Sequence, residues 1–162
     1  MTAGAPTAQR AFPYLAYADA PAAIEFLCRA FGFEERFRYP MPDGRLGHAE
    51  LVLEGTVLML ASVYPEMGFA SPRDLAGSHG QILWQVDDVD RHYARAREAG
   101  AVRAGEPVEE HGSRTYRALD PEGHRWMFST PAPEKGSLAV ALASRTLLFI
   151  APGVIARATS RQ

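Results

Sequence analysis

Cysteine, net charge and an N-terminal apolar segment are all scarce in this sequence of 162 residues. The one cysteine, Cys28, excludes an internal disulfide and a cysteine-rich zinc cluster, and it falls in a helical pattern where a thiol packs as a small apolar group. The formal net charge is −2, which favours neither nucleic acid nor an anionic membrane as a partner. The first ten residues, MTAGAPTAQR, lack the apolar core of a secretory signal. We therefore expect a cytoplasmic protein without a nucleic-acid or membrane partner.

A long uninterrupted apolar run is also missing. The most apolar stretch, 138–156, is interrupted by Arg145 and again by Pro152 and Gly153, whereas a membrane-spanning helix needs about 20 mostly apolar residues. We interpret this stretch as a docking or partner-facing segment. The common catalytic motifs are absent from the sequence as well: there is no Gly-x-Ser-x-Gly, no phosphate-binding glycine loop and no His-Glu-x-x-His.

The first half of the chain predicts the element order β-α-β-β-β. An alternating segment at 12–17 precedes a helical pattern at 20–31, where apolar residues recur at spacings of three and four up to a stop at Gly32. Turn sequences, PDG and EG, separate the strands that come next. These strands are expected at 33–39, 47–53 and 56–61.

The second half predicts the same order. Strand-like alternation at 81–86 precedes a helix at 89–99, with Asp88 as its N-cap and Gly100 as its stop. The turn sequence DPEG stands before the final strand. The last three strands are expected at 102–108, 115–119 and 124–129.

A constant spacing relates the two halves. Gly100 lies 68 residues after Gly32, and Met127 lies 68 residues after Met59, whereas Asp88 lies 69 residues after Asp19, which implies one residue deleted in the second helix. Two similar units at one spacing indicate an internal duplication. We therefore expect an N-terminal tail, a first module, a linker loop, a second module and a C-terminal extension, at 1–10, 11–62, 63–78, 79–131 and 132–162.

Three stretches carry a family resemblance: YLAYADAPAAIEFLCRAFGFEE at 14–35, QVDDVDRHYARAREAGA at 85–101 and YRALDPEGHRWMFST at 116–130. With the paired βαβββ units, they resemble the vicinal oxygen chelate superfamily of glyoxalases and bleomycin-resistance proteins, over about residues 11–131. The resemblance implies an α+β fold in which two modules form a curved mixed sheet around a cavity, with the helices outside. It does not fix the function, because this scaffold hosts lyases, dioxygenases, epimerases and drug-binding proteins.

Metal-using members of this family take their ligands, usually histidine and glutamate, from the first and last strands of each module. The matching positions in this sequence are Phe12, Met59, Gln81 and Met127. None is a usual ligand of a divalent metal, since only Gln81 offers an oxygen atom and that atom is neutral. We therefore expect no metal and no other cofactor at these positions.

A displaced metal site is the alternative to this interpretation. His48 and Glu50 share one face of the third strand, and His79 stands two residues before Gln81. The favoured interpretation is that His48 and Glu50 face solvent and that His79 belongs to a loop. Of the remaining histidines, His124 and His111 are assigned to turns. His92 is assigned to the solvent face of the second helix.

The period-two alternation also predicts the walls of the cavity. One face of the strands, which carries Tyr17, Trp84 and Trp126, is expected to pack under the helices as core. The opposite face is expected to form an apolar, partly aromatic ligand site with a few amides and one cation. Its expected residues are Phe12, Tyr14, Met59, Gln81, Leu83, Gln85, Arg125 and Met127.

The favoured function is metal-free binding of a small apolar or aromatic molecule by a homodimer, as the resemblance to the antibiotic-binding members implies. One alternative is a metal-dependent lyase, isomerase or dioxygenase with a rebuilt site. The other is a structural partner protein whose cavity is filled by Phe12, Met59 and Met127. An open pocket beside the two methionines would separate these alternatives.

Overall fold

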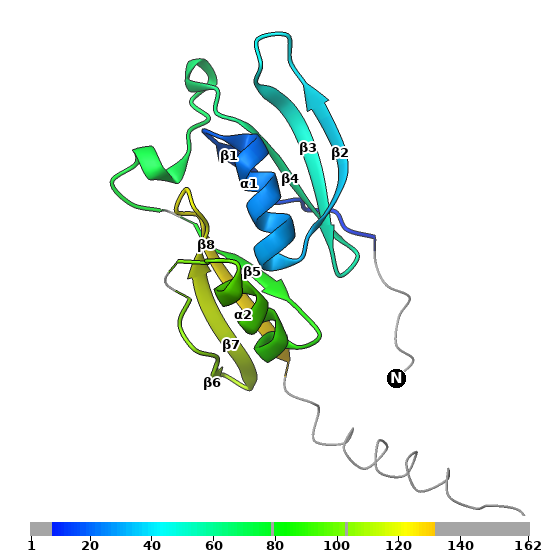
Figure 1. Cartoon of the computed structure of the whole chain (residues 1–162), viewed down its shortest axis with the longest axis vertical. Coiled ribbons are helices and arrows are strands. Elements are labelled where there is room, and N and C mark those ends of the chain that lie inside the picture. Colours follow the sequence, from blue (N-terminus) through cyan, green and yellow to red (C-terminus); the bar gives the residue numbers. More distant parts are fainter. Residues whose placement is uncertain (1–7, 79, 103, 132–162) are drawn as a thin grey trace, which may run out of the picture. The chain divides into compact units, whose positions relative to one another are not determined.

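Two four-stranded sheets make up the computed structural model, which describes residues 8–78, 80–102 and 104–131 (Figure 1). The first sheet has the strand order β1-β4-β3-β2. Its β1 and β4 run parallel, and its other neighbours run antiparallel. The strands are β1 Tyr14–Tyr17, β2 Glu34–Pro40, β3 Leu46–Leu53 and β4 Thr56–Ser62.

The second sheet repeats this topology with the order β5-β8-β7-β6. Here β5 and β8 run parallel and the other neighbours antiparallel. Its strands are β5 Ile82–Gln85, β6 Val108–Glu110, β7 Ser113–Leu119 and β8 Arg125–Pro131. The α+β fold with two βαβββ units is thereby confirmed.

The prediction of a strand at 102–108 is wrong. The strand β6 begins at Val108, and the preceding segment contributes an isolated bridge between Val102 and Leu119. Pro107 has no backbone N–H to donate to a ladder, and Gly105 weakens strand pairing. The apolar alternation of this segment therefore does not produce a strand before residue 108.

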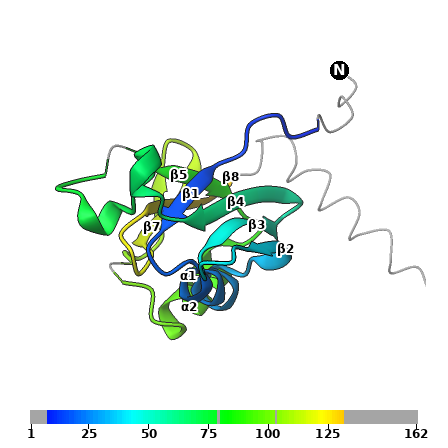
Figure 2. The ribbon, with the colours of Figure 1, turned by 90° about the horizontal axis from the view of Figure 1, so that it is seen from above.

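One helix follows the first strand of each sheet. The first, α1 Ala20–Phe26, begins at Asp19, whose carboxylate accepts from the backbone N–H of Ala22 at 3.1 Å. It continues as a π-helical turn, η1 Leu27–Phe31, and ends at Gly32 with φ +80°, a conformation that glycine adopts without steric cost. The second, α2 Val89–Glu98, begins in the same way at Asp88. Figure 2 shows α1 and α2 on the same side of the strands.

The segment between the sheets contains two short 3-10 turns, Pro65–Met67 and Pro72–Asp74. Among the described residues, no helix is long and apolar enough to cross a membrane. The expectations for the C-terminal extension and for His79 concern residues outside the described ranges.

Aromatic rings from the end of the first helix and from the second sheet meet beneath the helices in the core. Phe31, at the end of η1, lies 5.4 Å from Trp126 and 4.8 Å from Phe128, between ring centroids. Phe33 packs edge-on against Trp84 at 5.0 Å. All five rings are buried, and burying a large apolar side chain stabilises a fold by about 1.5–3 kcal/mol. The predicted core face of the strands is confirmed.

His92 of α2 also lies in this core, and the prediction that it faces solvent is wrong. Its side chain bridges two elements, because Nδ1 lies 2.7 Å from the hydroxyl of Tyr116 and Nε2 lies 2.8 Å from the carbonyl oxygen of Phe31. A carbonyl only accepts, so Nε2 carries the hydrogen and Nδ1 accepts from Tyr116. Burial lowers the pKa of His92 to about 4, and the ring is therefore neutral at pH 7.

Candidate functional site

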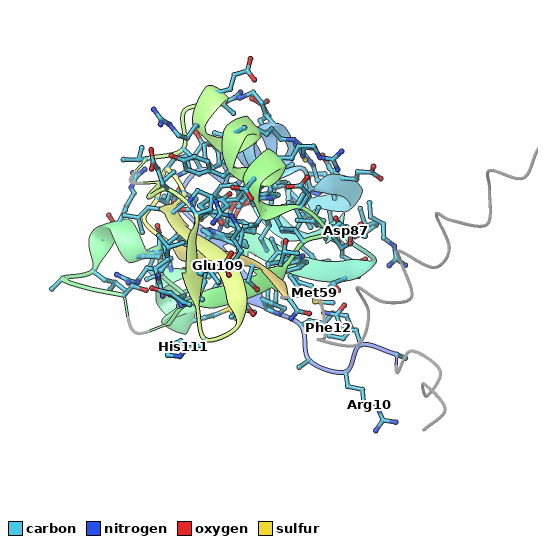
Figure 3. All side chains as sticks on the ribbon, turned by 90° about the horizontal axis from the view of Figure 1, so that it is seen from below. Arg10, Phe12, Met59, Asp87, Glu109 and His111 are labelled. Atoms are coloured by element: carbon cyan, nitrogen blue, oxygen red, sulfur yellow. The ribbon has the colours of Figure 1, made fainter. Side chains whose placement is uncertain are left out.

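One row of side chains crosses the first sheet on the face away from the helices. The strand register places Tyr14 beside Met59, Met59 beside Glu50, and Glu50 beside Phe37. Tyr14 is 46% exposed and Phe37 is 47% exposed. Phe12 precedes β1, and Figure 3 shows it with Met59 on the side of the molecule away from α2. This open face is therefore accessible, and it carries exposed aromatic side chains around one acid.

A polar cluster lies within the same face. The hydroxyl of Tyr14 is 3.2 Å from Nδ1 of His48 and 3.3 Å from the carbonyl oxygen of Gly47. The other ring nitrogen of His48 is 3.4 Å from Glu50, whose second oxygen is 3.6 Å from Arg36. Partial burial raises the pKa of the Tyr14 hydroxyl. Each polar group of this cluster has a partner, so the tyrosine is held in place on the sheet.

The second sheet presents a similar row. Leu83 pairs with Met127, and Met127 pairs with Arg117. The side-chain amide of Gln81 donates to the sulfur of Met127 at 3.5 Å. Arg117 forms an ion pair with Glu110 at 2.7 Å. Leu83 is 55% exposed, so this face is open as well.

The chemistry of these residues does not fit a divalent metal at the family's positions. Thioethers stand at Met59 and Met127, and the amide of Gln81 is turned to one of these sulfurs. Hard cations prefer oxygen ligands such as carboxylates, and imidazole suits divalent transition metals such as zinc or nickel. The alternative pair, His48 and Glu50, is in contact, but the described part of the chain contains no group of three or more His, Cys, Asp or Glu residues that could hold a metal ion.

A pocket of about 500 Å³ opens where β1 and β5 begin. Tyr14 and Leu15 of β1, Gln81 and Ile82 at β5, and the linker form its walls. The ring of Phe69, in the linker, lies 5.6 Å from the ring of Tyr14. Clefts of roughly 300–1,000 Å³ with mainly apolar walls are typical of small-molecule sites.

The turn between β7 and β8 forms one end of this pocket. Asp120 is buried there and accepts four hydrogen bonds, from the hydroxyl of Tyr17 at 2.7 Å, from Nε1 of Trp126 at 3.1 Å, and from the backbone N–H groups of Glu122 and His124, both at 3.0 Å. Burial alone would raise the pKa of Asp120, but these bonds and the nearby His124 outweigh it and lower the pKa. Asp120 is therefore a carboxylate in the folded protein.

Glu122 joins this turn to the first sheet and to the linker. Its carboxylate accepts from the backbone N–H groups of Ala18 and Asp19, at 2.7 and 2.8 Å, and from the hydroxyl of Ser71. Glu122 and Ser71 are both buried. The end of β1, the linker and the start of β8 are thus fixed around the pocket by one carboxylate.

The structure gathers only part of the predicted ligand site into this pocket. Tyr14, Gln81 and Arg125 line it. Leu83 and Gln85 line a second, more open hollow beside the segment before β1. Neither lining includes the remaining predicted residues, Phe12, Met59 and Met127.

Sequence reasoning missed His124, which lines the pocket. Its place after a glycine in DPEGH indicated a turn residue, and that is where it lies. No sequence signal indicated that the turn closes a pocket, because its contacts are with residues about 100 positions earlier in the chain. Residues 63–78 were predicted only as a linker loop, and Phe69 of this loop forms part of the pocket wall.

Comparison with known proteins identifies the family. The family model described as "Glyoxalase/Bleomycin resistance protein/Dioxygenase superfamily" matches residues 9–128. The protein Rv0887c of Mycobacterium tuberculosis is 36% identical over 126 residues, which cover 75% of this chain and 74% of the relative. A protein of Mycobacterium bovis, Mb0911c, has the same identity, with 83% of its length covered.

Solved structures agree with this assignment. TioX from Micromonospora sp. ML1 is 33% identical, with a TM-score of 0.58 over 78% of this chain and 98% of that chain. TnmS3, an antibiotic-binding protein from Streptomyces sp. CB03234, is 22% identical with a TM-score of 0.57, over 78% of this chain and 99% of that one. A bleomycin resistance determinant encoded on transposon Tn5 is 21% identical with a TM-score of 0.60, over 76% of this chain and 98% of that chain. The chain therefore belongs to the glyoxalase/bleomycin resistance protein/dioxygenase superfamily.

Proposed function

We propose that this chain binds a small apolar or aromatic molecule, without a metal, in the pocket at the start of β1 and β5. The pocket of about 500 Å³ is the observation that carries this proposal, although it opens at the starts of β1 and β5 and not beside Met59 and Met127, where the sequence placed it. The rings of Tyr14 and Phe69 offer an aromatic ligand two stacking surfaces. Family members described as antibiotic-binding and bleomycin-resistance proteins share this fold.

A homodimer is part of the same proposal. Tyr14, Phe37, Tyr39 and Leu83 are large apolar side chains, each 46% exposed or more. Extended apolar surface of this kind marks an interaction site, and a second copy would cover it with the same surface. We place the protein in the cytoplasm, where a chain with one cysteine needs no disulfide.

The test is a titration of chelator-treated protein with 1-naphthamide, a flat neutral ligand, by isothermal calorimetry. Ala70 lines the pocket from the linker, so Ala70→Trp should fill it and weaken binding at least tenfold. Ala94→Trp is the matched control, because Ala94 is exposed on α2 and lines no part of the pocket. Equal binding by the native chain and Ala70→Trp would refute this pocket as the site.

The metal-dependent alternative has a direct measurement of its own. His48 and Glu50 are 3.4 Å apart and could supply two ligands. Elemental analysis after dialysis against manganese, nickel or zinc should find no stoichiometric metal. One metal ion per chain, lost on His48→Ala and Glu50→Gln, would overturn the metal-free proposal in favour of an enzyme with a rebuilt site.

A further inference from the structure

The polar side chains of the pocket have one sign of charge. Among the described residues of its lining, the polar ones are Tyr14, Ser78, Gln81, His124 and Arg125, and none is an aspartate or a glutamate. The two neighbouring acids, Asp120 and Glu122, are buried and engaged in hydrogen bonds outside the lining. A ligand in this pocket therefore meets a cation and a histidine without meeting a carboxylate.

His124 is held in a fixed orientation at the end of the pocket. It is 8% exposed, its ring lies 4.5 Å from the ring of Tyr17, and its Nδ1 lies 3.2 Å from Oδ2 of Asp120. Nδ1 is buried and forms no hydrogen bond with a described residue, although Asp120 is near it, so Nε2, on the other edge of the ring, is the nitrogen left for the pocket. None of the described residues forms a hydrogen bond with Nε2.

Arg125 follows His124 in the chain and lines the same pocket. Its side chain is exposed, and it forms no ion pair with a described residue, whereas Arg114 and Arg117 of the same sheet are both paired. A guanidinium presents parallel N–H donors that match the two oxygens of a carboxylate. Adjacent residues of the pocket thus present a guanidinium and an imidazole nitrogen, and neither group has an ion-pair or hydrogen-bond partner among the described residues.

We propose that the ligand of this pocket is a carboxylic acid with a flat apolar body. Its carboxylate accepts from Arg125 and from Nε2 of His124, and its body lies against Tyr14 and Phe69. In this complex Asp120 lies on the Nδ1 side of the His124 ring and the ligand carboxylate lies on the Nε2 side. The inference rests on the proposed function, because it assigns the ligand class of the same pocket.

The charged and titratable groups around His124 are consistent with this arrangement. Asp120 lies beside Nδ1, and the ring of Tyr17 packs against the His124 ring at a tilt. Arg125 stands beside it in the lining, and Glu122 is bonded to the backbone of Ala18 and Asp19 rather than to the ring. A ligand carboxylate offsets the charge of Arg125, which no described acid neutralises.

The experiment compares 1-naphthoate with 1-naphthamide at pH 7 on the full-length chain. The two molecules have the same ring system and differ in charge. We expect 1-naphthoate to bind at least tenfold more tightly, because a hydrogen bond to a charged group contributes more than a neutral one. Arg125→Gln should abolish this preference, so that the variant binds 1-naphthoate and 1-naphthamide with equal affinity.

Two variants of His124 test the role of Nε2. His124→Asn keeps an amide donor for Asp120 but removes the nitrogen that faces the pocket, so the preference should fall several-fold. His124→Gln places an amide donor near the position of Nε2 and should restore part of the preference for 1-naphthoate. Arg91→Gln, on α2, removes one exposed arginine outside the pocket, and the preference should remain at the native value.

The outcomes separate the two proposals. Tight binding of 1-naphthamide with no preference for 1-naphthoate would overturn the carboxylate assignment and leave the proposed function standing. Failure of both ligands to bind would overturn the pocket and with it the assignment. A preference that persists in Arg125→Gln, or that falls equally in Arg91→Gln, would show that the carboxylate is attracted by net charge or held elsewhere.

Discussion

At the scale of the residue, His92 makes the fold sensitive to acid. Its folded pKa is about 4, below its usual value of 6.5, because burial disfavours the charged ring. The unfolded chain takes up a proton below about pH 6.5 and the folded chain does not. The contribution of His92 to stability is therefore complete above about pH 6.5 and is lost as the pH falls from 6.5 to 4, by up to about 3 kcal/mol.

The variant His92→Gln has no group that titrates in this range. We expect the difference in unfolding free energy between pH 7 and pH 4.5 to be about 2 kcal/mol smaller than in the native chain. Urea denaturation at the two pH values measures it. His111→Asn is the control, because His111 is exposed and its positive φ suits asparagine. This variant should show the same difference in unfolding free energy between the two pH values as the native chain. An unchanged difference in His92→Gln would contradict this assignment.

Residues whose role depends on strand alternation could be predicted from the sequence. Tyr17, Trp84 and Trp126 were placed in the core because side chains of a strand alternate between its faces. The surroundings of His92 and His124 could not be predicted, because their contacts come from the first half of the chain. His92 bonds to Phe31, and His124 packs against Tyr17. A single-sequence pattern carries no information on contacts at that separation.

At the scale of the element, the two helices end at equivalent glycines with different surroundings. Gly32 and Gly100 both have positive φ, +80° and +85°. A Cβ at Gly100 would meet nothing within 4 Å, whereas a Cβ at Gly32 would collide with the guanidinium of Arg95 from α2. At the end of η1, Gly32 therefore lies against Arg95 of α2. At the end of α2, Gly100 serves only the backbone turn.

Replacing these glycines should give unequal losses. Gly100→Ala should cost about 1 kcal/mol of unfolding free energy, from the left-handed backbone alone. Gly32→Ala should cost roughly 1 kcal/mol more, since Arg95 must also move. Chemical denaturation measures both, and Gly105→Ala, with open space and no positive φ, should be neutral within about 0.5 kcal/mol. Equal losses at Gly32 and Gly100 would show that Arg95 swings away freely.

Most elements could be predicted from their own residues, and the exceptions have local causes. Capping chemistry predicts where the helices begin and end. They begin at Asp19 and Asp88, and they end at Gly32 and Gly100. The π-helical turn at the end of the first helix could not be predicted, because the apolar spacing of three and four is that of an ordinary α-helix.

At the scale of the whole molecule, the open face of both sheets should hold two copies together. Leu83 lies on this face and is 55% exposed. We expect Leu83→Glu to weaken self-association at least tenfold, because it would bury an unpaired charge in the interface. Sedimentation equilibrium over a range of protein concentrations measures the change.

The control for this prediction is another exposed apolar residue. Val102 is 57% exposed and lies outside the named strands. Val102→Glu should therefore leave the association unchanged. A native chain that sediments as a monomer at all concentrations would refute the homodimer, and equal effects of both substitutions would place the interface elsewhere.

The carboxylate of Glu122 has a consequence for the order in which the chain acquires its structure during synthesis. The backbone N–H groups of Ala18 and Asp19 are synthesised 104 and 103 residues before their acceptor, Glu122. Until then, water satisfies them. Contacts between residues so far apart in sequence slow folding. The junction between β1 and α1 is therefore among the first parts of the protein to be made and among the last to be completed, and a nascent chain stalled before residue 122 would carry an unfinished first sheet.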